Sequence, residues 1–236
     1  MELFTLLVIG HVIAGTTALV SFWMPVFARK GSTTHIRWGR IFVIAIYSAA
    51  ALACLMGILN LTLTSDRLPT VTDRALFAGL FGWMMIYLSL LSILFVRYGV
   101  GVIKNKRNHH ANRSIINLIV MGIVAAAALR CGVAGVMLGQ PLMVALAGLG
   151  SIAIFTFLRA SLRPAAAPTA YQAEHLKAML GAGISAYTAF LSVGLLRIMP
   201  EHVFNPIIWS VPSIVGVMLI IHNLRVISAK RALRPH

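Results

Sequence analysis

Apolar residues fill most of the chain in long uninterrupted runs, and short polar stretches separate these runs. The runs do not alternate between apolar and polar positions, so they predict helices rather than the strands of a membrane barrel. A helix needs about 20 apolar residues to cross the hydrocarbon layer of a membrane. Seven runs come close to that length, at about residues 3–27, 36–63, 75–97, 115–138, 142–158, 176–199 and 206–226. The pattern therefore predicts an all-α, polytopic integral membrane bundle of about seven transmembrane helices.

The composition supports the same class of protein. Hydrophobic residues make up 59% of the 236 residues, and charged residues make up only 11%. A water-soluble domain carries far more charge than this, and no stretch between the runs is long enough to build a separate soluble core. We therefore expect a single transmembrane helical domain over residues 1–236.

The basic residues decide the orientation. The formal net charge is +15, which in a soluble protein would suggest nucleic-acid binding. Here, however, 16 of the 20 lysines and arginines flank the first, third and fifth connections between the predicted spans or lie in the C-terminal tail. Because cytoplasmic loops carry an excess of Lys and Arg, the N-terminus is predicted outside and the C-terminus in the cytoplasm. We expect the lipid bilayer to be the partner, with anionic lipid head groups at the basic cytoplasmic loops, and no nucleic acid.

One group of polar residues lies in the outer half of the predicted spans. The helical rise places His11, Cys54, Arg130 and Cys131 about 5–8 Å above the midplane. An arginine inside a membrane normally faces the bundle interior or an aqueous cavity, so His11 and Arg130, with Arg197, are candidates for binding an anionic or carbonyl-bearing ligand. Two alternatives stay open: Arg130 extends toward water or caps carbonyls, or His11 and the cysteines bind a soft metal such as Cu(I).

A second group lies at the predicted cytoplasmic face. His35 opens the second span, His175 opens the sixth, and His222 lies within the apolar run of the seventh. Neutral imidazoles on facing helices can hold a haem iron from both sides, and Arg37 and Arg40 are candidates for the propionate groups. These five residues are the predicted cofactor-binding set, with haem b or a quinone as the cofactor. A structural histidine whose ring nitrogens are satisfied by neighbours remains the alternative for each.

The other histidines and the acidic residues limit the functions that the sequence allows. His109 and His110 follow a cluster of basic residues, and we interpret them as ordinary interfacial residues that face the lipid head groups. No carboxylate lies in the middle of a predicted span, which disfavours a carboxylate proton relay. The last span holds no lysine for a Schiff base, so a retinal protein is excluded.

Three stretches resemble a known family. They are His11-Val-Ile-Ala-Gly15, His35-Ile-Arg37-Trp38-Gly39-Arg40-Ile41, and His175-Leu-Lys-Ala-Met179 running on to Arg197. Over about a third of its length, the chain resembles the uncharacterised bacterial membrane proteins grouped as the domain of unknown function 2306 family. The resemblance implies seven or eight helices, a multi-pass place in the bacterial cytoplasmic (inner) membrane, and attention to the four conspicuous side chains in these stretches, namely His11, His35, His175 and Arg197. It implies no particular activity.

Three functions stay open on the sequence alone. The one we favour is a cofactor-binding redox or electron-transfer membrane protein, which uses haem or a quinone. The second is a small transporter, channel or lipid-handling protein with a cavity lined by His and Arg. The third is a non-catalytic assembly subunit whose polar residues only pack helices. Whether the chain is an enzyme is left undecided.

Overall fold

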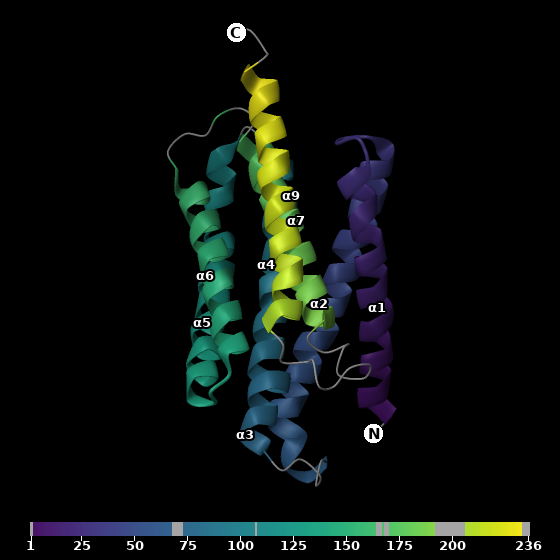
Figure 1. Cartoon of the computed structure of the whole chain (residues 1–236), viewed down its shortest axis with the longest axis vertical. Coiled ribbons are helices and arrows are strands. Elements are labelled where there is room, and N and C mark those ends of the chain that lie inside the picture. The colour runs from purple at the N-terminus through teal and green to yellow at the C-terminus, as the bar shows by residue number, and fades with distance from the viewer. Residues whose placement is uncertain are drawn as a thin grey trace. The chain divides into compact units, whose positions relative to one another are not determined.

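The computed structural model describes residues 2–67, 73–106, 108–163, 167, 170–191 and 206–232. Helices account for 93% of these described residues, and none of them lies in a strand, so the all-α prediction is confirmed. The elements, shown in Figure 1, are α1 (Glu2–Phe27), α2 (Thr33–Arg67), α3 (Arg74–Phe77), the π-helix η1 (Ala78–Met84), α4 (Met85–Asn105), the short 3-10 helix η2 (His109–Arg113), α5 (Ile115–Met137), α6 (Pro141–Leu162), α7 (Ala170–Ala189) and α9 (Pro206–Ala232).

Six helical segments of the described chain are long and apolar enough to cross a membrane. They are Leu3–Phe27, Thr33–Thr62, Arg74–Asn105, Ile115–Met137, Pro141–Leu162 and Ser210–Ala229. Five predicted spans and the greater part of the last one match these segments. The multi-pass helical membrane class is thus supported, while the orientation and the number of crossings stay predictions.

The sixth predicted span differs from the structure. The run at residues 176–199 predicts a helix that begins near residue 176, but α7 begins at Ala170. Three polar residues in the first half of α7, namely Glu174, His175 and Lys177, keep it out of the set of strongly apolar helices. The part of the run after residue 191 lies outside the described residues.

By their contacts, the residues of the chain divide into two compact units. Unit 1 consists of Met1–Leu94 and Ile119–Thr156, and unit 2 consists of Phe95–Leu118 and Phe157–His236. Helices α4, α5 and α6 each contribute residues to both units. The prediction of a single domain over the whole chain stays a prediction.

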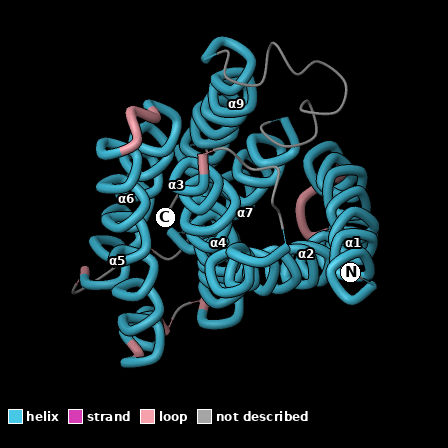
Figure 2. Tube along the Cα trace, turned by 90° about the horizontal axis from the view of Figure 1, so that it is seen from below, coloured by secondary structure: helices cyan, strands magenta, loops and turns pink. Residues whose placement is uncertain are grey.

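In unit 1, α1 and α2 form an antiparallel pair that runs side by side over most of its length (Figures 1 and 2). Alanines on the inner side of α2, including the buried Ala49 and Ala53, allow the backbones to approach closely. The turn between the helices contains Gly31, whose φ of 82° lies in the left-handed region that glycine adopts without steric cost.

The helical segment that starts after Asp73 contains one π-helical interruption. Asp73 caps its first turn by accepting a hydrogen bond from the Leu76 backbone N–H at 2.9 Å. In η1 the i to i−4 hydrogen-bond pattern changes, and Asn60 of α2 donates to the Phe81 carbonyl at 3.0 Å. Unit 1 therefore supports the π-helix with a side chain from a neighbouring helix.

Helices α5 and α6 form the second antiparallel pair, joined by a tight turn (Figure 1). The N–H of Gln140 donates to the Gly135 carbonyl at 2.7 Å, and Gly139 has a φ of 61°, which together make a Schellman-type helix end. Pro141 then takes the first position of α6, where its missing N–H costs nothing.

In unit 2, α7 packs against α9 and against the second half of α4. The closest approach is at Gly99 of α4, where an added Cβ would lie 2.3 Å from the methyl carbon of Met179 and 3.0 Å from Cβ of Ala178. Nearby, the Tyr98 and Phe157 rings stack with their centroids 4.2 Å apart. These contacts position the ends of α4, α6 and α7 next to one another.

Candidate functional site

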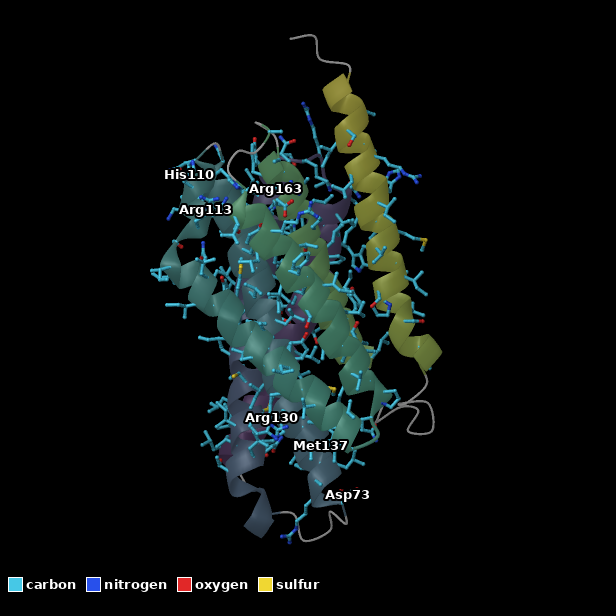
Figure 3. The ribbon with its side chains drawn as sticks, turned by 90° about the vertical axis from the view of Figure 1, so that its left-hand side faces the viewer. Asp73, His110, Arg113, Arg130, Met137 and Arg163 are labelled. Carbon is cyan, nitrogen blue, oxygen red and sulfur yellow. The ribbon has the colours of Figure 1, made fainter. Side chains whose placement is uncertain are left out.

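A cavity with a largely polar and charged rim lies in unit 2, where α4 and α6 end and α7 begins. Its volume is about 410 Å³, which is within the range of small-molecule sites. Apolar residues of α4, α6 and α7 form part of the wall, and the polar lining residues are Tyr98, Lys106, His109, Asn112, Arg163, Tyr171 and Glu174. We call this cavity the unit 2 pocket. In Figure 3, the labels of His110, Arg113 and Arg163 lie at the end of the helices where this pocket is found.

The unit 2 pocket has an excess of positive charge. Its one carboxylate, Glu174, accepts a hydrogen bond from Lys177 at 2.5 Å and another from the Tyr98 hydroxyl at 3.3 Å. The charge of Glu174 is therefore balanced by Lys177. Lys106 and Arg163 have no carboxylate partner among the described residues. Two cationic groups at one cavity favour an anionic ligand.

His109 adds a polar atom that the described protein does not satisfy. Its ring is half-buried, and Nε2 is shielded from solvent without a hydrogen-bond partner among the described residues. A buried polar atom of this kind costs free energy unless a ligand or water meets it. The buried Asn112 also lines the pocket, and its side-chain oxygen accepts a hydrogen bond from Asn105 at 2.7 Å.

Two local features fold the chain around the unit 2 pocket. Lys106 ends α4 with a φ of 40°, a left-handed conformation that turns the backbone sharply toward η2. Arg113 at the end of η2 then donates to the carbonyl of Ser161 at 3.2 Å and to the carbonyl of Leu162. These carbonyls lie at the C-terminus of α6, where a cation is favourable and where helical hydrogen bonds are missing. The result is that His109 lies at the pocket.

Sequence reasoning missed His109, Lys106 and Arg163 as site residues. The basic loop is compatible with a solvated surface, and a left-handed lysine carries no composition signal. One signal was present: Asn105, Asn108 and Asn112 are spaced through the loop, and asparagine is typical of tight turns that fold a chain back on itself.

Each predicted haem ligand has its own surroundings within its unit, and the haem site stays a prediction. In unit 2, Nδ1 of the half-buried His175 lies 2.8 Å from the Gly99 carbonyl, whereas His222 is exposed on α9. In unit 1, Nδ1 of His35 lies 3.1 Å from the Pro25 carbonyl. Across the described residues, no group of three or more His, Cys, Asp or Glu side chains is placed to hold a metal ion.

The predicted outer set is also divided between different neighbours. In unit 1, Nδ1 of His11 lies 2.9 Å from the Ala49 carbonyl of α2. The exposed Arg130 of α5, labelled in Figure 3, has its guanidinium carbon 4.2 Å from the centroid of the Trp83 ring of η1. The contact is a cation–π interaction, so the described contacts of Arg130 are aromatic rather than ionic. Arg197 lies outside the described residues.

The two cysteines are separate thiols. Cys54 is half-buried on α2, and the buried Cys131 of α5 lies with its sulfur 3.9 Å from the Met143 carbonyl. The backbone contact of Cys131 suits a packing residue.

The fold and the unit 2 pocket define a helical, multi-pass membrane protein with a basic cavity at one end of its helices. No protein-family model, no curated protein and no solved structure matches the chain. The resemblance to the domain of unknown function 2306 family stays a prediction from the quoted residues.

Proposed function

We propose that this chain is a multi-pass protein of the bacterial cytoplasmic membrane that binds an anionic ligand in the unit 2 pocket, in the manner of a small transporter or lipid-handling protein. The observation that carries the proposal is that Lys106 and Arg163 both line a cavity where Glu174, the one carboxylate among its described lining residues, is already paired with Lys177. The predicted topology assigns this end of the helices to the cytoplasm.

The donors at the unit 2 pocket suit the oxygens of a phosphate or carboxylate group. Arg163 offers planar N–H groups that match two oxygens at once, and Lys106 offers a mobile point charge. The buried ring nitrogen of His109 gains a partner when such a group enters. These three side chains would supply most of the binding free energy for such a ligand. For this reason we place ligand binding above the redox function that the sequence favours.

The first test measures the affinity of the detergent-purified full-length protein for glycerol phosphate by titration calorimetry. Replacing Arg163 with alanine is expected to weaken binding at least tenfold, because a hydrogen bond to a charged group contributes about 1.5–3 kcal/mol. The matched control is Arg159→Ala, which removes an exposed arginine of the last turn of α6 that does not line the pocket. Equal affinities of the wild type and Arg163→Ala would refute the proposal.

A redox function is the second candidate, and one observation favours it. A carbonyl only accepts hydrogen bonds, so the contact of His175 with Gly99 requires a proton on Nδ1 of the imidazole. This is the arrangement in which a backbone carbonyl orients a histidine that binds a metal through Nε2. The same arrangement holds for His35 with Pro25.

The visible absorption spectrum separates the two candidates. We expect the purified protein, air-oxidised and then reduced with dithionite, to show no Soret band after supplementation with haem, because the unit 2 pocket offers cationic donors for an anionic ligand and His222 is exposed on α9. A Soret band at one haem per chain, lost in His175→Ala, would instead make the redox function the leading one.

A further inference from the structure

A second cavity lies on the surface of unit 1, along the first two turns of α2. Its volume is about 410 Å³, and its lining residues are Thr33, Ile36, Arg37, Arg40 and Ile41. These positions are three or four residues apart, so they share one face of the helix. We call this cavity the α2 groove. It belongs to a different unit from the unit 2 pocket, so ligand binding there does not depend on the proposed function.

The α2 groove carries two arginines and no compensating charge. Arg37 and Arg40 are both exposed, and neither makes an ion pair with a described carboxylate. The ammonium of the neighbouring Lys30 does not line the groove, and it donates to the carbonyls of Pro25 at 3.0 Å and Val26 at 2.7 Å. Burial lowers the pKa of Lys30, and its role is to cap the end of α1. The two guanidinium groups are therefore the charged groups that line the groove.

The exposed face of α2 changes from charged to apolar beyond the groove. Ile44, Leu55 and Ile58 follow Arg40 at helical spacing, and their side chains are 64%, 43% and 45% exposed. At the adjoining end of α1, the Trp23 and Phe27 rings stack 5.7 Å apart. Aromatic side chains next to basic ones mark the level of the lipid head groups in membrane proteins. The face therefore matches a molecule with an anionic head and an apolar tail.

We propose that the α2 groove is a binding site for one anionic phospholipid of the surrounding bilayer. The phosphate is held by Arg37 and Arg40, whose planar donors bind two oxygens each, while Ile36 and Ile41 contact the glycerol region. An acyl chain then lies along the exposed apolar face of α2. The net positive charge of the groove selects phosphatidylglycerol over a lipid whose head group is neutral overall.

The test is a lipid titration of the detergent-purified full-length protein, read by native mass spectrometry. Phosphatidylglycerol is compared with phosphatidylcholine of the same acyl chains, in the wild type and in the double variant Arg37→Gln, Arg40→Gln. We expect the affinity for phosphatidylglycerol to fall about 25-fold in the double variant, since each basic residue near an anionic head group contributes about a fivefold factor. The affinity for glycerol phosphate at the unit 2 pocket is expected to stay unchanged.

A second double variant, Arg29→Gln with Arg159→Gln, serves as the matched control. It removes two exposed arginines that do not line the α2 groove, so its affinity for phosphatidylglycerol should stay near that of the wild type. An equal loss in this control, or equal affinity of the wild type for the two lipids, would overturn the site. Displacement of the lipid by glycerol phosphate alone would assign the groove to a free phosphate and would also overturn it.

If the glutamine double variant does not fold, the pair Arg37→Lys, Arg40→Lys replaces it. This pair keeps both charges and removes only the planar donors, so a loss of binding at an unchanged melting temperature supports the site. Wild-type affinity in this variant would contradict the proposed phosphate contacts.

Discussion

Replacing Gly150 with alanine is expected to destabilise the protein by about 3 kcal/mol, because it overpacks the interior of unit 1. A Cβ at this position would lie 1.7 Å from the Tyr87 hydroxyl oxygen and 3.0 Å from a methyl carbon of Leu91. Tyr87 is fully buried, and its hydroxyl donates to the Leu146 carbonyl at 3.0 Å, so the ring has no room to move without losing that bond. Equilibrium unfolding in mixed detergent micelles measures the change.

Gly148 provides the matched control on the same helix. It is exposed, and nothing lies within 4 Å of its added Cβ, so Gly148→Ala should raise stability by about 0.5–1 kcal/mol through helix propensity. In the Gly150→Ala background, Tyr87→Phe should recover part of the loss because it removes the oxygen that the new methyl group meets. A Gly150→Ala variant as stable as Gly148→Ala would show that the Tyr87 contact is not a close one in the protein.

The membrane helices could be predicted from the sequence because length and apolarity alone decide whether a helix crosses a bilayer. The ends of α1, α5 and α6 in the structure lie within a few residues of the predicted spans. The predicted start of α7, near residue 176, lies several residues after the observed start at Ala170. A helix can continue through polar residues such as Glu174, which the structure pairs with Lys177. The π-helix η1 was not predicted, since nothing in the run of apolar residues marks a change in hydrogen-bond pattern.

The candidate site could be predicted only in part. The helical rise gives the depth of a residue in the membrane but not its neighbours. The sequence therefore places His175 and His222 in one cytoplasmic group by depth alone. The structure instead gives His175 a carbonyl partner on α4 and leaves His222 exposed. A cavity lined by His and Arg was expected at His11 and Arg130, and that site stays a prediction. The unit 2 pocket is lined by His109 and Arg163, which the sequence did not single out. The tertiary contacts of η2 determine which residues line the pocket, and these contacts cannot be inferred from the periodicity of the sequence.

The contacts between η2 and the end of α6 depend on Arg113. Replacing Arg113 with methionine is expected to destabilise unit 2 by about 3 kcal/mol, since two hydrogen bonds from a charged donor to α6 are lost. Those bonds join η2 to the carbonyls of Ser161 and Leu162. Because η2 carries His109 into the unit 2 pocket, the folded variant should also bind glycerol phosphate about tenfold more weakly, a loss of about 1.4 kcal/mol.

Arg113 affects ligand binding only through the position of η2, so ligand affinity must be measured separately from the stability of the variant. Arg113 does not line the pocket itself, whereas His109 and Asn112 of the same short helix do. Titration calorimetry of the folded Arg113→Met variant, performed well below its melting temperature, isolates the effect on the pocket. Arg113→Lys keeps a cation at the C-terminus of α6 and should recover part of the affinity, while Arg159→Met should leave it unchanged. A destabilised Arg113→Met variant with wild-type affinity would show that the position of η2 does not shape the ligand site, and the donors of Lys106 and Arg163 alone would then account for binding.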